Sequence, residues 1–337
     1  MTPPYPKRWI IEVSRSCNLH CMMCRESNDK YPQMLMDMSL LDKLAPFLKE
    51  AEAILPFGWG EPLMHPKFKN ILRTIRDINS QAQIVFNTNG QLMLSSLIET
   101  IIETKVNIVC FSIDSILPSL YETIRRGARF DRVIETIETL NDLKRKKNSP
   151  LPHLFMEIVL MKQNIGELED IATFLKRYRF SGVLLEEVRP SAVDKQTLET
   201  LKIHKIKKHH NVIKRFSERL AKNNVLLGGP IGSAYARSDP GSPVNKIGKM
   251  YPSMDQLTCD EKHPSVCRQP WFNVFVSYDG NCSPCCMNSS FQIGNLSNSN
   301  FDAIWNGEKM AALRNALIRK KYSRQCKQCI QEQRHHC

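Results

Sequence analysis

The strongest restriction on the fold comes from an alternation, within the first 190 residues, of short apolar runs with amphipathic helical segments. Runs that are apolar on both faces are typical of strands buried between layers of helices. The helical segments between them predict crossover connections, and therefore a parallel sheet. The candidate strands cover residues 9–13, 53–57, 84–88, 108–113, 155–160 and 183–188.

Short motifs follow four of the candidate strands. A cysteine-rich loop follows the first, "GWGEP" (58–62) the second, "NTNG" (87–90) the third and "SIDS" (112–115) the fourth. The α/β pattern predicts either an open doubly wound sheet or a partial barrel, and both bind ligands at the carboxyl ends of their strands. The motifs therefore predict one ligand site along a single rim.

Composition places the chain among packed globular proteins. Hydrophobic residues make up 42% of its 337 residues, and no apolar run is long enough to span a bilayer. The N-terminal segment "MTPPYPKRWIIEV" lacks the apolar core of a signal peptide, so we expect a cytoplasmic protein without a membrane partner. Twelve cysteines are many for a reducing compartment, and their clustering predicts metal or redox chemistry.

The formal net charge of +13 raises the question of an anionic partner. The densest basic stretch, residues 201–216, carries apolar residues at helical spacing, which predicts an amphipathic helix with a solvated basic face. No aromatic platform or nucleic-acid module accompanies this stretch. The sequence therefore disfavours nucleic acid as a partner.

Three cysteines, Cys17, Cys21 and Cys24, follow the first strand in a C-x3-C-x2-C pattern. A closed metal site usually has four protein ligands, so three thiolates predict a centre with an open position. An iron–sulfur cluster held by three thiolates leaves one iron able to bind a substrate or cofactor. The alternative is a zinc site completed by His20 or by a distant residue.

The cysteine triplet, the glycine-rich turn and the two polar strand ends, in this order, resemble the radical S-adenosylmethionine (SAM) superfamily. The resemblance covers nearly the whole chain and implies a partial (β/α)6 barrel of the TIM type. Trp59 stands where the family usually has a glycine, and Met23 stands where many members have an aromatic residue over the adenine. Methionine is an adaptable apolar side chain that can fill the same role.

The resemblance implies that Cys17, Cys21 and Cys24 hold a [4Fe–4S] cluster whose fourth iron is chelated by SAM. Reductive cleavage of SAM then yields a 5′-deoxyadenosyl radical, which abstracts a hydrogen atom from the substrate. Arg125 is the best match to the arginine that meets the SAM carboxylate, and Arg126 is the alternative. By the same motif match, the residues that contact SAM are Met23, Gly58, Gly60, Glu61, Asn87, Thr88, Ser112, Asp114 and Arg125.

Eight further cysteines lie between Cys259 and Cys337. This segment contains a predicted hairpin around Asp279–Gly280 and a short predicted helix, "FDAIW" at 301–305. It resembles the SPASM/Twitch module, which holds auxiliary iron–sulfur clusters after many radical SAM barrels. A zinc ribbon is the alternative, since four thiolates also suit zinc. In the short Twitch form, the resemblance implies one auxiliary [4Fe–4S] cluster on Cys267, Cys285, Cys326 and Cys329.

The remaining cysteines of this segment have no assigned role, and a second auxiliary cluster stays open. A leftover thiol could also donate a hydrogen atom to a substrate radical. Cys110, alone in the apolar run "NIVCFSID", is predicted to be a buried core thiol. The unassigned cysteines are Cys259, Cys282, Cys286 and Cys337.

The expected organisation is a radical SAM core over residues 1–190, a linker or substrate-facing insert over 191–262 and a SPASM/Twitch domain over 263–337. The insert and the fifth and sixth strands are expected to select the substrate. The side chains expected to take part are Glu157, Glu186, Glu187 and Arg189.

These features predict an oxygen-sensitive radical SAM oxidoreductase that acts on an alcohol or sugar-like small molecule, with the auxiliary cluster accepting an electron. The short segment before the first strand favours a small molecule, because many peptide modifiers carry an N-terminal recognition domain. Oxidation, epimerisation or cross-linking of a ribosomal peptide is the alternative, and a non-catalytic electron-transfer protein is an alternative of another class. The family implies a flavodoxin or ferredoxin as electron donor. Substrate, net reaction and oligomeric state stay open.

Overall fold

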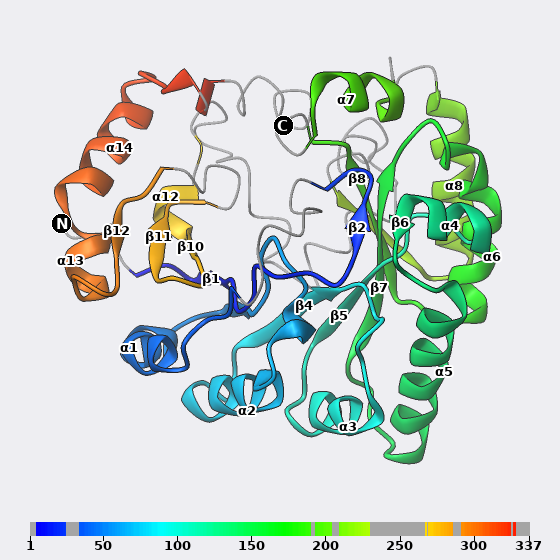
Figure 1. Ribbon diagram of the computed structural model, residues 1–337, viewed down its shortest axis with the longest axis horizontal. Coiled ribbons are helices and arrows are strands. Elements are labelled where there is room, and N and C mark those ends of the chain that lie inside the picture. The colour runs from blue at the N-terminus through cyan, green and yellow to red at the C-terminus, as the bar shows by residue number, and fades with distance from the viewer. Residues whose placement is uncertain are drawn as a thin grey trace. The chain divides into compact units, whose positions relative to one another are not determined.

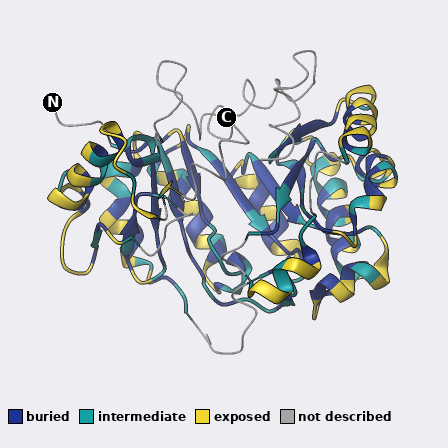
Figure 2. Cartoon of the chain, turned by 90° about the horizontal axis from the view of Figure 1, so that it is seen from above, coloured by how far each residue is buried: buried dark blue, intermediate teal, exposed yellow. Residues whose placement is uncertain are grey.

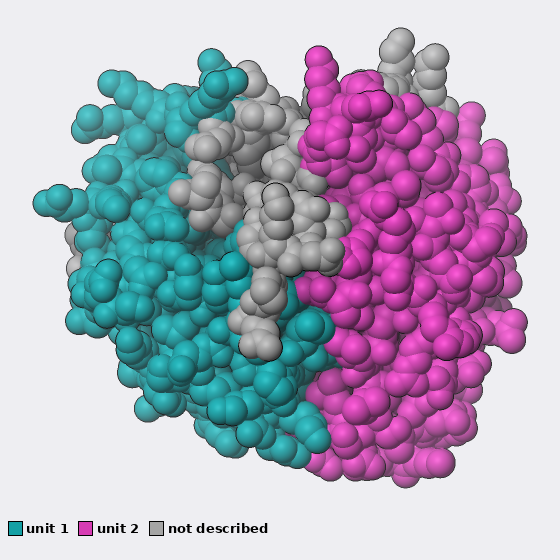
Figure 3. Space-filling model, in the orientation of Figure 1, with its two compact units in different colours: residues 1–16, 33–86, 251–337 teal, residues 17–32, 87–250 magenta. Residues whose placement is uncertain are grey.

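The computed structural model describes residues 5–24, 34–189, 193–203, 209–229, 267, 269–285, 291–324 and 326–327. Contacts divide the chain into two compact units (Figure 3). Unit 1 comprises residues 1–16, 33–86 and 251–337, and unit 2 comprises residues 17–32 and 87–250. Each unit therefore draws on segments that lie far apart in the sequence. The expected division into core, insert and auxiliary-cluster domain stays a prediction.

Unit 1 is built on a sheet around β1 (Arg8–Ile11). On one side β1 pairs in parallel with β3 (Ala53–Leu55), which pairs in parallel with the first part of β4 (Gln83–Thr88). On its other side β1 pairs in parallel with β10 (Asn273–Val276). A strand from the C-terminal segment thus extends the sheet that the first strand begins, as Figure 1 shows.

β10 turns back into β11 (Asn281–Ser283), which pairs antiparallel with β12 (Gly294–Asn295). In the turn, Gly280 has φ +81°, a left-handed conformation that glycine adopts without a steric penalty. Gly280 N donates to Ser277 O at 2.9 Å and closes the turn. The predicted Asp-Gly hairpin is therefore confirmed.

Aromatic side chains form part of the core of unit 1. The predicted short helix is confirmed as α13 (Phe301–Trp305), which Asn300 caps by accepting a hydrogen bond from Ala303 N at 2.9 Å. Phe301 packs against Trp9 of β1 with 4.4 Å between the ring centroids, and both side chains are buried. Other helices of this unit are α1 (Ser39–Leu48), η1 (Pro62–Met64), α2 (Phe68–Ile78), α12 (Gln269–Phe272) and α14 (Glu308–Ile318).

Unit 2 holds parallel strands in the order β5–β7–β8–β9. These are β5 (Ile108–Ser112), β7 (His153–Leu160), β8 (Gly182–Glu187) and β9 (Leu226–Gly228). A separate two-stranded ribbon pairs β2 (His20–Cys21) with β6 (Arg125–Arg126). The helices include α3 (Ser95–Glu103), α4 (Pro118–Ile124), α5 (Phe130–Lys146), η2 (Ile165–Glu167), α6 (Leu168–Arg177), α7 (Lys195–Leu201) and α8 (His210–Lys222).

The strands are the most buried elements, and the helices carry exposed residues on one face (Figure 2). In α2 the buried residues Phe68, Ile71, Leu72 and Ile75 form a stripe at helical spacing. This is the pattern by which an amphipathic helix covers a core. In the part of the chain that the structure describes, none of the helices combines the length and apolar character needed to cross a membrane.

All the predicted strands are present, and their ends differ from the predicted ones by at most two residues. β9 was not predicted, because three residues are too few to show the alternation of apolar and polar side chains, or the apolar run, that identifies a strand. Its parallel pairing with β8, in the register Val183↔Leu227, supplies the missing stabilisation.

The prediction of one helix over residues 201–216 is wrong in its extent. α7 and α8 are separate helices, and residues 204–208 between them lie outside the described residues. On α8, Phe216 is buried, whereas Arg215 is exposed and pairs with Glu169 at 2.8 Å. The basic face of α8 is therefore solvated and partly ion-paired.

Candidate functional site

The cysteine loop of unit 2 is anchored by the ribbon of β2 and β6. Backbone pairing places Cys21 opposite Arg125. Cys24 N donates to Cys21 O at 3.1 Å, so the chain turns back between these two cysteines. Cys21 and Met23 are buried, whereas Cys17 and Cys24 are half-buried. The loop thus combines a fixed backbone at Cys21 with two more accessible thiols.

The thiols of the loop interact electrostatically. Burial raises the pKa of the Cys21 thiol to about 11, the Arg125 guanidinium opposes this rise, and the charges of Asp114 and Cys24 add to it. Among the described residues, no group of three or more His, Cys, Asp or Glu side chains is gathered closely enough to hold a metal ion. Three soft thiolates from one loop, beside a cation, suit an iron–sulfur cluster by their donor chemistry.

A buried ion pair lies beside Cys21. Arg125 Nε lies 2.8 Å from Asp114 Oδ2, and Arg125 Nη1 donates to Cys21 Sγ at 3.8 Å. Asp114 is fully buried and accepts a hydrogen bond from Val159 N at 2.8 Å. Arg126, in contrast, is exposed. The structure therefore places Arg125 beside the cysteine loop with Asp114 as its anchor, which favours Arg125 over Arg126 as the functional arginine.

Glu157 contacts polar side chains that lie at the ends of neighbouring strands. Asn87 Nδ2 donates to Glu157 Oε2 at 2.8 Å, and Ser112 Oγ lies 3.5 Å from the same oxygen. Thr88 is buried, and its Oγ1 accepts a hydrogen bond from Gly90 N at 3.1 Å. The structure thus brings two predicted SAM contacts, Asn87 and Ser112, together with Glu157, which was predicted to take part in selecting the substrate.

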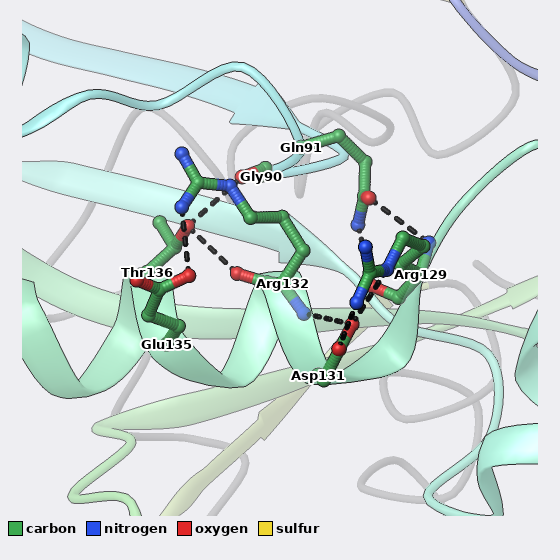
Figure 4. A network of polar contacts seen from close by, with 7 residues as sticks. All are labelled: Gly90, Gln91, Arg129, Asp131, Arg132, Glu135 and Thr136. Carbon is green, nitrogen blue, oxygen red and sulfur yellow. Dashed lines mark hydrogen bonds and ion pairs between the residues drawn. The ribbon is translucent and has the colours of Figure 1, made fainter.

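The loop after β4 is fixed by the start of α5 (Figure 4). Thr136 Oγ1 donates to Gly90 O at 3.1 Å, and Arg129 N donates to Gln91 Oε1 at 2.9 Å. Gly90 has φ +75°, and a Cβ there would come within 2.9 Å of Val133 Cγ2. The glycine of "NTNG" is therefore required for close packing against α5, and this packing holds the adjoining end of β4 in place.

In unit 1 the "GWGEP" turn packs against the segment that leads into the cysteine loop. A Cβ at Gly60 would lie 2.4 Å from Arg15 C and 2.6 Å from Ser16 O, so the close approach of the two backbones requires glycine. Glu61 N donates to Ser16 O at 2.9 Å and joins the turn to this segment. Ser16 is followed directly by Cys17 in the chain.

The other residues of the turn also have local contacts. Glu61 is 3% exposed, and its Oε1 accepts a hydrogen bond from Leu63 N at 3.2 Å at the start of η1. Trp59 N donates to Glu12 Oε1 at 3.0 Å, and a Cβ at Gly58 would come within 2.5 Å of Glu12 Cγ. These contacts show how the turn is built, and the contact of Gly58, Gly60 and Glu61 with SAM stays a prediction.

Family models match two separate parts of the chain. The model of the radical SAM superfamily matches residues 11–175, and that of SPASM, an iron–sulfur cluster-binding domain, matches residues 267–330. The chain belongs to the radical SAM superfamily. The two matched ranges contain the cysteines that the sequence analysis assigned to the SAM-binding and auxiliary clusters.

Two curated proteins resemble this radical SAM protein over part of their length. A tungsten-containing aldehyde ferredoxin oxidoreductase cofactor-modifying protein from Pyrococcus furiosus is 27% identical over 188 residues, which are 55% of this chain and 52% of that protein. A probable GTP 3′,8-cyclase from Methanococcus aeolicus is 23% identical over 217 residues, which are 64% of this chain and 66% of that protein. The chain thus spans less than two thirds of each relative.

A solved structure extends the likeness to the C-terminal segment. Streptococcus suis SuiB bound to S-adenosylmethionine superposes with a TM-score of 0.69 at 15% identity, covering 92% of this chain and 68% of SuiB. At this identity the likeness shows the fold alone. Together with the family models it confirms the predicted fold class, a partial (β/α)6 barrel of the radical SAM type with a C-terminal SPASM module.

Membership also confirms the predicted cofactors. A radical SAM domain implies a [4Fe–4S] cluster that binds SAM, and a SPASM domain implies auxiliary iron–sulfur clusters. This outcome disfavours the zinc alternatives for both cysteine groups. Which residues hold each cluster stays a prediction.

The described thiols of the SPASM segment fit an auxiliary cluster by their chemistry. Burial raises the pKa of the Cys267 thiol to about 11, the backbone N–H of Gln269 opposes this rise, and the charge of Cys326 adds to it. Cys267 and Cys326 are therefore within electrostatic range of each other, although far apart in sequence. Cys285 is half-buried, and Cys329 lies outside the described residues.

Two other cysteines lie inside strands. Cys282 of β11 is fully buried, its Sγ lies 3.8 Å from Gly280 O, and burial raises the pKa of its thiol to about 12. Cys110 of β5 is 1% exposed, so the predicted core thiol is confirmed. Both side chains pack within the sheet rather than in a loop. Of the unassigned cysteines, Cys259, Cys286 and Cys337 lie outside the described residues.

Two carboxylates lie on the same face of β7 and β8. The parallel register pairs Val159 with Glu186, and Val159 shares its face of β7 with Glu157 two residues away. Burial raises the pKa of Glu186 to about 7, Arg189 opposes this rise, and the charges of Glu157 and Glu187 add to it. Arg189 Nη2 lies 3.8 Å from Glu186 Oε2. Burial also raises the pKa of Glu157, and this rise is opposed by Arg189 and Arg125.

A Glu186→Gln variant is expected to become more stable, relative to the wild type, as the pH rises. Between the usual carboxyl pKa of 4.5 and the folded value of about 7, the folded protein holds a proton that the unfolded chain has lost. The stability of the wild type therefore falls as pH rises through this window, whereas glutamine carries no titrating group. The difference should reach at most about 3 kcal/mol at pH 8.

Anaerobic thermal unfolding at pH 5 and pH 8 measures this difference. Glu187→Gln, at the next position of β8, controls for the loss of a carboxyl group from the strand. An unfolding temperature of Glu186→Gln that stays at a constant offset from wild type across this pH range would contradict the raised pKa.

Proposed function

We propose that this radical SAM protein is an oxidoreductase of the dehydrogenase type that acts on an alcohol or sugar-like small molecule. The substrate carbon loses a hydrogen atom to the 5′-deoxyadenosyl radical, which becomes 5′-deoxyadenosine. A protein carboxylate would accept the proton of the substrate hydroxyl group, and the auxiliary [4Fe–4S] cluster, when bound and oxidised, would supply an acceptor for the remaining electron. The product is a carbonyl compound.

The carboxylates Glu157 and Glu186 carry this proposal. A group with a pKa near the working pH is well suited to accept a hydroxyl proton, and burial raises the pKa of Glu186 to about 7. Glu157 is bonded to Asn87, a predicted SAM contact, so a substrate held by these carboxylates would lie close to SAM. This arrangement supports the loss of a hydrogen atom and a proton from neighbouring substrate atoms.

The proposed sites use the residues that the sequence analysis assigned to them. The SAM-binding cluster is assigned to Cys17, Cys21 and Cys24, and the auxiliary cluster to Cys267, Cys285, Cys326 and Cys329. SAM is assigned to Met23, Gly58, Gly60, Glu61, Asn87, Thr88, Ser112, Asp114 and Arg125. The proposed electron donor is a flavodoxin or ferredoxin.

An anaerobic experiment tests the proposal in two stages. Protein reconstituted with iron and sulfide should contain about eight iron atoms per chain, the number expected for two [4Fe–4S] clusters. With dithionite and SAM it should form 5′-deoxyadenosine, and a panel of alcohols and sugars should contain compounds that raise the yield. Deuterium placed on the carbinol carbon of such a compound should appear in the 5′-deoxyadenosine.

Modification of a ribosomal peptide is a second candidate. SuiB has also been solved bound to its precursor peptide SuiA, and that structure superposes on this chain with a TM-score of 0.66 at 16% identity. A yield of 5′-deoxyadenosine that rises only with peptides would replace the small-molecule proposal by this candidate. An iron-loaded protein that neither binds nor cleaves SAM would support a non-catalytic electron-transfer protein instead.

A further inference from the structure

The ion pair of Asp114 and Arg125 leaves a guanidinium facing one of the cysteines proposed to hold the SAM-binding cluster. Arg125 Nε lies 2.8 Å from Asp114 Oδ2, and Nη1 donates to Cys21 Sγ at 3.8 Å. The side chain of Arg125 is 9% exposed, and that of Asp114 is fully buried. The cation is therefore held against the Sγ atom of Cys21 with little water around it.

Both ends of this contact are fixed by the fold. Backbone pairing in the β2–β6 ribbon places Cys21 directly opposite Arg125. On the other side, Asp114 Oδ1 accepts a hydrogen bond from Val159 N at 2.8 Å, and Asp114 O accepts one from Asn164 Nδ2 at 2.7 Å. The position of the guanidinium relative to Cys21 Sγ is thus set by strand pairing and by an anchored carboxylate.

A fixed cation beside a ligand sulfur changes the energy of cluster reduction. Reduction adds one negative charge to the cluster, and a nearby positive charge stabilises the more negative state. The effect is large where burial limits screening by salt. Hydrogen bonds to ligand sulfurs act in the same direction on cluster potentials. The negative charge of Asp114 partly opposes this stabilisation of the reduced cluster. The guanidinium contacts both the Asp114 carboxylate and Cys21 Sγ, so it lies between the carboxylate and the sulfur.

We propose that Arg125 raises the reduction potential of the iron–sulfur cluster held by Cys21, and that Asp114 is the positioning residue that fixes Arg125 for this purpose. This inference rests on the ligand set of the proposed function. It assigns Arg125 a role toward the cluster that does not depend on SAM. The oxidised cluster takes up one electron from the donor protein, and the guanidinium, which stays protonated throughout, makes that uptake more favourable.

A redox titration without SAM tests the inference. Reconstituted wild-type protein and Arg125→Gln are poised at a series of potentials, and the reduced cluster is quantified by its electron paramagnetic resonance signal. The signal of the SAM-binding cluster is recognised in parallel samples as the one that changes when SAM is added. At a fixed potential, the ratio of reduced to oxidised cluster should be about tenfold lower in Arg125→Gln, which is about 59 mV for a one-electron couple.

Three further variants separate this role from effects on folding and from surface charge. Arg125→Gln with Asp114→Asn removes both buried charges, avoids an unpaired carboxylate, and should still show a lowered potential. Arg125→Lys keeps a positive charge and should recover part of the shift. Arg129→Gln, just before α5, removes an arginine that is exposed and paired with Asp131, and this variant should titrate like the wild type.

An unchanged potential in the double variant, or an equal shift in Arg129→Gln, would overturn the inference. Neither result affects the proposed function, which is judged by the formation of 5′-deoxyadenosine. A wild-type chain that cannot be loaded with a cluster on Cys17, Cys21 and Cys24 would remove the basis of both.

Discussion

Replacement of Cys24 by alanine is expected to abolish the formation of 5′-deoxyadenosine. Two thiolates remain in the loop. A cluster bound only through Cys17 and Cys21 has lost one of its three bonds to the protein, and we expect it to dissociate. Without the cluster, no electron reaches SAM. The product should fall below detection in an anaerobic assay with dithionite, and the iron content should fall by about four atoms per chain.

The matched control is Cys110→Ala. Cys110 is also a cysteine of unit 2, but it is 1% exposed and lies within β5. Its loss should leave the iron content and the yield of 5′-deoxyadenosine close to those of the wild type, with a modest fall in unfolding temperature from the small cavity that it leaves. If Cys24→Ala keeps the full iron content and still cleaves SAM, the assignment of the cysteine loop is wrong.

Gly60→Ala is expected to lower the stability of the protein more than the same substitution at Gly58, the other glycine of the "GWGEP" turn. The added Cβ would lie 2.4 Å from Arg15 C and 2.6 Å from Ser16 O, and both of these are backbone atoms that no side-chain rotation can move away. Relief of the clash requires the two segments to separate, which would break the hydrogen bond from Glu61 N to Ser16 O. The expected loss of stability is about 3 kcal/mol.

Gly166→Ala is the matched control, because a Cβ at Gly166 would meet no atom within 4 Å. Its stability should stay within about 0.5 kcal/mol of the wild type. Anaerobic thermal unfolding compares the two variants, and iron content reports whether the displaced Arg15–Ser16 segment also disturbs cluster loading at Cys17. Equal unfolding temperatures for the two variants would show that the turn tolerates a side chain at Gly60.

The β/α alternation and the motifs at the strand ends could be predicted from the sequence because they are local. A strand buried on both faces is apolar over its whole length, as in β5, and a Gly-rich turn or a cysteine triplet is visible as a run of letters. The hairpin at Gly280 could be predicted for the same reason, since a left-handed residue favours glycine.

The side-chain contacts of the site could not be predicted in this way. Asp114 and Arg125 each matched a family motif, but their ion pair and its approach to Cys21 depend on how three separate segments fold together. The same is true of Glu157. Its contact with a predicted SAM residue is the hydrogen bond from Asn87, which lies 70 positions away in sequence. Gly60 was predicted only to contact SAM, and its close packing against the backbone of Arg15 and Ser16 became visible in the structure.

The pairing of β10 with β1 has a consequence for how the protein is made. β1 leaves the ribosome before β10, so one of its two edges stays unpaired until β10 has been synthesised, more than 250 residues later. An unpaired edge is a template for association with other chains, and contacts between distant residues slow folding. Unit 1 therefore reaches its complete sheet only after β10 has been translated, and we expect the edge of β1 to be open to association with other chains until then.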